Sequence, residues 1–213
     1  MQAIERIDIS NNWLTITFVV ALVLLVVLKS LNKQKLYGYV GAYFQKGFIV
    51  NKVKEKTSFF TGFNLVLYVF SILVYAIFLT YLTPLFLPEL TVDFNLFVKV
   101  LSIGFVYITL FMVLDMVFCN VLEVQNQLTY FVAAKIGYFY SAALIFFPFL
   151  IAVMYSFLSI YWLLGIFGIL FVLGVVLTFA NNKNLIISKL FYFILYLCAL
   201  EIAPLLIIYK ITV

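Results

Sequence analysis

Six long stretches of almost uninterrupted apolar residues constrain this chain more than any other feature of its sequence. Crossing a hydrocarbon core of about 30 Å takes roughly 20 residues as helix, and lipid offers the backbone no other hydrogen-bond partner. The runs also lack the alternation that is typical of a membrane β-barrel. We therefore predict an all-α, polytopic membrane protein, one integral domain over residues 1–213, with helices at about 13–28, 59–83, 96–118, 136–157, 160–180 and 190–209.

The composition excludes a water-soluble fold and most metal chemistry. Hydrophobic residues make up 67% of the chain and charged residues 10%, whereas soluble domains carry about a quarter charged residues. The sequence has no histidine, which is the commonest metal ligand and the general base that titrates near neutrality. Cys119 and Cys198 stand 79 residues apart and form no CxxC pair. We expect no catalytic residue, no metal and no cofactor, so the inventory favours a protein that is not an enzyme.

Lysines are concentrated between the first two predicted helices, in segment 29–57. Cytoplasmic loops of membrane proteins accumulate Lys and Arg, so we predict that this segment is cytoplasmic and that both chain ends are periplasmic. Counting alternate sides from it, the loops 120–135 and 181–189 are also inside. This arrangement fits a multi-pass protein of the bacterial inner membrane. The formal charge of +5 then reports topology, and we expect no binding to nucleic acid.

The same segment carries aromatic residues at helical spacing, which predicts an interfacial helix. Lysines at headgroup depth would bind the anionic inner leaflet, or the segment would dock a partner, and both interpretations stay open. The apolar side of the helix is formed by Leu36, Tyr37, Tyr39, Val40, Tyr43, Phe44 and Phe48. The lysines expected to contact lipid or a partner are Lys33, Lys35, Lys46, Lys52, Lys54 and Lys56.

Glu201, near the middle of the last predicted helix, is the strongest candidate functional residue. A carboxylate within a membrane helix costs a few kcal/mol on insertion scales, which makes it a functional candidate by default. Pro204 cannot donate to the carbonyl group of Leu200, so the helix should kink beside Glu201. This arrangement would suit a proton or cation. Alternatively, a protonated Glu201 bonds a neighbouring helix or a partner subunit.

Asp115, near the inner end of the third predicted helix, is a weaker candidate. Asn120 and Glu123 follow it, so its side chain could reach the cytoplasmic interface. By helix rise, Asp115 and Glu201 differ by about 12 Å in depth, which disfavours a direct carboxylate pair.

Glycines in the fifth predicted helix indicate close packing against a neighbour. They are Gly165, Gly168 and Gly174, and they form no phosphate-binding loop. We therefore interpret them as helix contacts.

The stretch 195–206, Leu-Tyr-Leu-Cys-Ala-Leu-Glu-Ile-Ala-Pro-Leu-Leu, followed by Tyr209-Lys210, resembles a Bacteroidota inner-membrane family. That family is known as domain of unknown function four-two-seven-one. The similarity extends over nearly the whole chain and includes several helices, a Lys-rich first inner loop and the terminal Leu-Glu-Ile-x-Pro-Leu-Leu motif. The resemblance implies that Glu201 and Pro204 act as a unit in a Gram-negative envelope. Because the family has no known function, the resemblance implies no particular activity.

These features predict a non-enzymatic inner-membrane subunit or assembly factor of a larger cell-envelope complex, for example one serving protein secretion or surface assembly. Its expected partners are membrane lipids and other membrane proteins or a second copy of itself. The alternative is a small proton- or ion-coupled transporter that uses Glu201. A membrane enzyme that acts on lipid is a third hypothesis. Co-purified partners would favour the subunit. Ion flux in proteoliposomes would favour the transporter, and lipid turnover would favour the enzyme.

Overall fold

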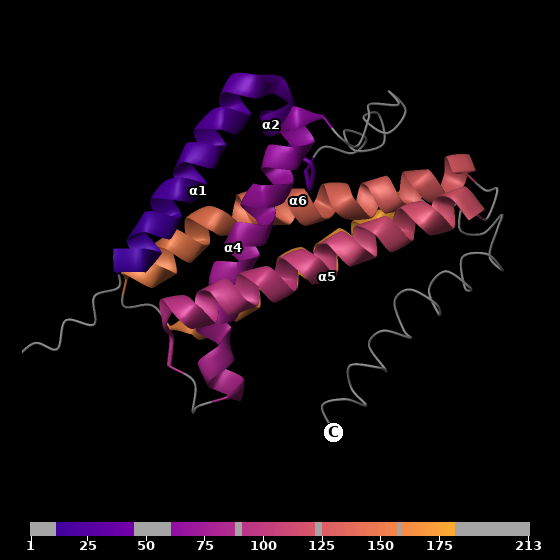
Figure 1. Ribbon diagram of the computed structural model, residues 1–213. Coiled ribbons are helices and arrows are strands. Elements are labelled where there is room, and N and C mark those ends of the chain that lie inside the picture. The colour runs from indigo at the N-terminus through magenta and orange to yellow at the C-terminus, as the bar shows by residue number, and fades with distance from the viewer. Residues whose placement is uncertain (1–11, 45–60, 88–90, 122–124, 157–158, 182–213) are drawn as a thin grey trace, which may run out of the picture.

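The computed structural model describes residues 12–44, 61–87, 91–121, 125–156 and 159–181, and the regular structure within these ranges is entirely helical (Figure 1). All the described helices except one are long and apolar enough to cross a membrane. The predicted helical membrane class is therefore confirmed. The sixth expected helix, at about 190–209, lies outside the described residues. The helices are α1 (Asn12–Leu31), α2 (Lys33–Val40), α4 (Gly62–Phe86), α5 (Phe94–Val121), α6 (Gln125–Tyr155) and α7 (Ile160–Asn181), with α2 as the short one.

Most helix bounds agree with those predicted to within a few residues, and the expected join between 157 and 160 falls between α6 and α7. The segment 120–135, predicted as a loop, is helical over most of its length. Helix α5 continues to Val121, and α6 begins at Gln125 rather than near residue 136. Hydropathy detects only the part of a helix that suits lipid, whereas a helix continues through polar residues beyond it. Helices of 28 and 31 residues measure about 42 and 46 Å, more than the hydrocarbon core.

Helix α4 is the centre of the bundle, because it packs against α1, α5 and α6, while α7 packs along α6. Phe70 and Phe78 of α4 are fully buried, as are Phe146 of α6 and Leu163 of α7. The rings of Phe78 and Phe146 meet edge to face with centroids 5.0 Å apart, the geometry that aromatic pairs prefer. Figure 1 shows α4 between α1 and the α5–α6 pair, which extends to the right beyond it. The core therefore lies where α4 crosses α6.

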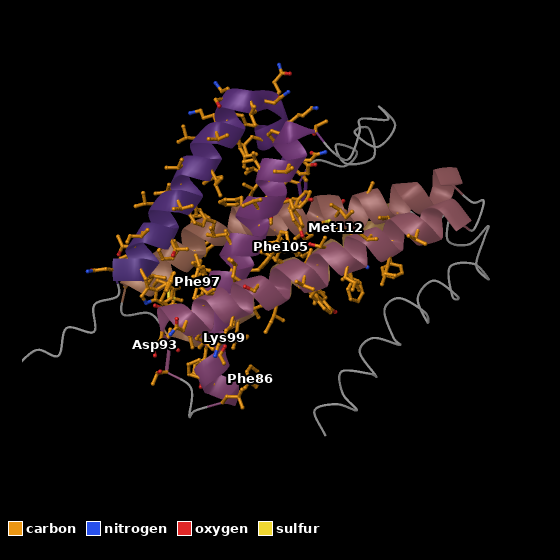
Figure 2. All side chains as sticks on the ribbon, viewed as in Figure 1. Phe86, Asp93, Phe97, Lys99, Phe105 and Met112 are labelled. Atoms are coloured by element: carbon orange, nitrogen blue, oxygen red, sulfur yellow. The ribbon has the colours of Figure 1, made fainter. Side chains whose placement is uncertain are left out.

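The long helices alternate in direction. Trp13, at the start of α1, stacks on Tyr81 near the end of α4 and contacts Phe97 near the start of α5. The hydroxyl groups of Thr15 and Tyr155 are 3.0 Å apart, which brings the end of α6 to the same place. Figure 2 shows Phe97 on the α5 side of this end of the bundle. The opposite ends of α1 and α4 therefore lie beside α2, where Tyr39 stacks on Phe63.

Candidate functional site

The structure describes three of the residues predicted to carry function. Asp115 lies on α5, whereas Lys33 and Lys35 lie in the first turn of α2. The remaining predicted residues lie outside the described part of the chain, and they are Glu201, Pro204, Lys46, Lys52, Lys54 and Lys56.

Asp115 is buried inside the protein, with 3% of its side chain exposed. It continues the strip of α5 that faces the bundle, which also includes Phe97, Leu101 and Met112 at helical spacing. Asp115 is not without an interaction partner. Sequence alone left open a side chain that reaches the headgroups. The structure instead turns it toward the neighbouring helices.

Helix α2 starts directly after α1 because Asn32 caps it. The Asn32 side chain accepts a hydrogen bond from the Lys35 backbone N–H at 2.9 Å, which satisfies one of the free donors of the first turn. The helix ends at Gly41, whose N–H bonds the Tyr37 carbonyl oxygen. The Lys33 ammonium lies 5.8 Å from the centre of the Tyr37 ring, on the exposed side of α2. The cap thus places both lysines at the corner where α1 and α2 meet.

The predicted apolar side of the segment divides between two surroundings. Tyr37 and Phe44 are exposed, as an interfacial helix requires, but Tyr39 is buried against protein. The Tyr39 ring stacks on Phe63 of α4 and meets Tyr140 of α6 edge-on. Burial raises the pKa of the Tyr39 phenol well above its usual range. The apolar side of the segment therefore has two surroundings, since Tyr39 packs on α4 and α6 whereas Tyr37 and Phe44 are exposed.

Polar contacts fasten α2 to α6. The buried Ser141 hydroxyl of α6 donates a hydrogen bond to the Tyr39 backbone carbonyl oxygen at 2.6 Å. Beyond the end of α2, the Tyr43 hydroxyl donates to the Leu170 carbonyl oxygen of α7 at 3.1 Å, and the Tyr138 carbonyl oxygen of α6 is 3.5 Å away. Burial, and to a smaller extent Tyr138, raises the pKa of the Tyr43 phenol, so it remains a neutral donor.

The glycines of α7 fall into two groups. A Cβ atom on Gly174 would lie 3.1 Å from the Tyr43 hydroxyl oxygen, so the predicted close packing is confirmed there. At Gly165 and Gly168 a Cβ atom would meet nothing within 4 Å among the described residues. Close approach therefore explains one glycine of α7 and leaves two without a described neighbour.

The sequence analysis gave no structural role to the tyrosines of the spanning helices, and two of them join helices in this bundle. On α4, the Tyr75 hydroxyl donates to the Phe139 carbonyl oxygen at 2.8 Å, and the Tyr68 hydroxyl lies 2.6 Å from that of Thr109. The spacing of seven residues between Tyr68 and Tyr75 places both on one face and is the signal that could have found them. Hydrogen bonds of these tyrosine hydroxyl groups thus join α4 to α5 and α6.

Other parts of the described surface bear on ligands and partners. Within the described ranges, no group of three or more His, Cys, Asp or Glu residues could hold a metal ion.

Helix α5 is the least covered of the spanning helices, with 6% of its span buried, against 50% for α4 and 61% for α6. Figure 2 shows α5 along one side of the molecule, with side chains directed away from the bundle. Its exposed apolar residues include Ile103, Phe105, Val106, Leu110 and Val113.

Five helices of the described ranges are long and apolar enough to span a membrane, and with their aromatic core they define a multi-pass helical membrane protein. Over residues 14–212, the chain matches the family described as Domain of unknown function (DUF4271), and it belongs to that family. The resemblance seen in the sequence is thereby confirmed. The search of curated proteins found no match, and neither did the search of solved structures.

Proposed function

We propose that this protein is a non-enzymatic subunit or assembly factor of a larger cell-envelope complex in the inner membrane of a Bacteroidota species. The lysine-rich segment 29–57 lies in the cytoplasm, and both chain ends lie in the periplasm. The lysine distribution supports this orientation. The alternating directions of the described helices are compatible with it, since α1 and α4 meet the membrane surface together at the α2 end.

The exposed surface of α5 is the observation that carries this proposal. Association of membrane helices depends on close packing and interhelical hydrogen bonds, because lipid is as apolar as the helices themselves. Helix α5 makes such contacts along one strip, which leaves Ile103, Val106 and Leu110 exposed. A helix held on one side has the rest of its surface available to a partner helix.

The length of the α5–α6 pair supports a partner surface that continues out of the lipid. These helices exceed the hydrocarbon core by about 12 and 16 Å. Helix α2, which carries Lys33 and Lys35, packs on the middle of α6, at Tyr140 and Ser141. The part of the pair near Val121 and Gln125 therefore extends beyond α2, and a partner seated on α5 would continue along it.

Site-specific photocrosslinking in native membranes tests this proposal. A photoreactive amino acid at Val106 or Ile103 of α5 should give protein adducts of defined mass, which mass spectrometry of a mild-detergent purification would identify. Val26 of α1 is similarly exposed and is the matched control. Adducts with lipid alone at both α5 positions, together with a purified protein that lacks partners, would refute the subunit proposal.

A small proton- or ion-coupled transporter is the second candidate function. Asp115 favours it, since a carboxylate with 3% exposure inside an apolar bundle is a potential titrating group, alongside Glu201. Flux in proteoliposomes should then be abolished by Glu201→Gln and reduced by Asp115→Asn. Asp93→Asn, at an exposed aspartate outside the core, should leave flux unchanged. A protein that carries no ions under an imposed gradient contradicts this alternative.

A further inference from the structure

The outward side of α2 forms one continuous strip that begins with a lysine and continues with apolar side chains. Lys33, Tyr37 and Val40 are exposed and stand at i, i+4 and i+7, the spacing of one helix face. Phe44 follows in the turns beyond Val40, and 86% of its side chain is exposed. The buried Tyr39 lies on the other side, toward α4 and α6. These four exposed residues, Lys33, Tyr37, Val40 and Phe44, form the α2 strip.

The α2 strip lies near one edge of the hydrocarbon core. Trp13 and Tyr155 mark the other edge, where aromatic side chains gather as they do at membrane interfaces. By helix rise, Lys29 is at most about 24 Å from Trp13 along α1, and Ser141 is at most about 21 Å from Tyr155 along α6. Both lengths fall short of the core thickness of about 30 Å. Since α2 follows Lys29 at the upper end of α1 in Figure 1 and is bonded to Ser141, its outward strip borders acyl chains as well as headgroups.

The corner between α1 and α2 is positively charged, and no described carboxylate lies at its surface. Lys29 and Lys33 are exposed, and neither α1 nor α2 contains Asp or Glu. Within the described ranges the carboxylates are Asp93, which lies beside Phe94 at the other end of α1, and Asp115, which is buried. The two ammonium groups are therefore available to an anion from outside the bundle.

A phospholipid with an anionic headgroup fits this combination of charge and depth. Lysines at the end of a short span extend their alkyl chains along apolar surface and place the ammonium among the headgroups. The Lys33 ammonium lies 5.8 Å from the centre of the Tyr37 ring, so charge and aromatic surface are adjacent. A lipid phosphate can accept hydrogen bonds from lysine while an acyl chain follows Val40 and Phe44. A partner helix on the same strip would instead cover Lys33 with apolar surface, which costs free energy.

We propose that the corner between α1 and α2 binds the phosphate of an anionic phospholipid through Lys29 and Lys33, with an acyl chain along Val40 and Phe44. The sequence left lipid and a partner protein open as occupants of this segment, and the α2 strip favours lipid. The hydrogen bond from Ser141 fixes α2 on α6, so the strip has a defined place on the protein. This inference does not depend on the proposed function, because it requires only that α1 crosses a membrane.

Photocrosslinking to lipids in nanodiscs tests this site. The full-length protein, with a photoreactive amino acid at Tyr37, is placed in nanodiscs of equal parts phosphatidylglycerol and phosphatidylcholine. Mass spectrometry should show severalfold more adducts with phosphatidylglycerol than with phosphatidylcholine. The same amino acid at Val19, which is exposed within the span of α1, should show no such preference.

Lysine variants test which charge is responsible. Lys33→Gln should lower the adduct ratio by up to about fivefold, the effect of one lysine near a charged membrane surface. Lys99→Gln is the matched control, because Lys99 is exposed on α5 near the Trp13 end of the bundle, and it should leave the ratio unchanged. In the protein without the photoreactive residue, phosphatidylglycerol should raise the thermal midpoint in detergent more than phosphatidylcholine does. The Lys29→Gln/Lys33→Gln variant should lose this difference.

Further arms separate lipid from other anions and from protein. At equal ionic strength, replacing chloride by inorganic phosphate should leave the adduct ratio unchanged, and a ratio that falls overturns the assignment to lipid. Equal yields of both lipids at position 37, or equal effects of Lys33→Gln and Lys99→Gln, overturn the site. In native membranes, protein adducts from position 37 in place of lipid adducts overturn it in favour of a partner protein.

Discussion

The hydroxyl oxygen of Tyr43 lies 3.1 Å from the position that a Cβ atom on Gly174 would occupy. The same hydroxyl donates a hydrogen bond to the Leu170 carbonyl oxygen, one turn earlier on α7. Tyr43, just beyond α2, therefore packs tightly against α7, although 127 residues separate it from Leu170. The beginning of the lysine-rich segment is thus fixed to the bundle, and Lys33 and Lys35 keep a defined position beside the end of α1.

Enlarging Gly174 should destabilise the protein. In the Gly174→Ala variant, the new methyl group would be closer to the Tyr43 hydroxyl oxygen than ordinary van der Waals contact allows. We expect a loss of about 1–3 kcal/mol in the free energy of unfolding, which thermal unfolding in detergent would show as a lower midpoint. Gly104→Ala is the control, because its methyl group meets nothing within 4 Å among the described residues. Equal midpoints for the two variants would contradict tight packing of Tyr43 on Gly174.

The Tyr43 hydroxyl should account for both the hydrogen bond to Leu170 and the steric clash expected in Gly174→Ala. Tyr43→Phe removes the hydrogen bond to Leu170 and should cost about 1 kcal/mol, whereas Tyr37→Phe at an exposed tyrosine should cost almost nothing. Tyr43→Phe also removes the oxygen that the new methyl group of Gly174→Ala would meet. The double variant should therefore be more stable than the sum of the two single effects predicts. Simple additivity in thermal unfolding would mean that the two residues do not interact.

Ser141 should hold α2 on α6. The Ser141→Ala change removes a fully buried donor to the Tyr39 carbonyl oxygen, which keeps a hydrogen bond from the Ala42 backbone N–H. We expect a loss of about 1 kcal/mol and faster amide hydrogen exchange over residues 33–44. Ser102→Ala is the control, since the exposed Ser102 hydroxyl donates to the Val98 carbonyl oxygen within α5. Unchanged exchange over 33–44 would show that α2 is held by its aromatic contacts instead.

Removing the Asp115 carboxylate should cost more than removing an exposed one. Asp115→Ala leaves a cavity at a position that is buried in the bundle, with an expected loss of about 1–3 kcal/mol. The exposed Asp93, whose carboxylate accepts a hydrogen bond from Thr91, provides the comparison, and Asp93→Ala should lower stability by less than about 0.5 kcal/mol. Thermal unfolding of both variants is the measurement, and a larger effect at Asp93 would contradict this assignment.

Sequence predicted the described long helices well because the bilayer sets their length and requires backbone groups to bond within the helix. It failed at the start of α6, since residues 125–135 are polar enough to resemble a loop but remain helical beyond the lipid. It also failed for Tyr39, because periodicity shows that a residue shares an apolar face without showing whether lipid or protein covers that face.

The sequence by itself determined the helical membrane class, the approximate bounds of five spanning helices and the family. These follow from hydropathy and from motifs, which are properties of contiguous residues. Only the tertiary structure decided that Asp115 faces the bundle, that α2 docks on α6, and that Gly174 rather than Gly165 or Gly168 receives Tyr43. Such choices depend on contacts between residues distant in the chain. In an apolar chain almost every helix face suits either lipid or protein, so pattern alone cannot select between them.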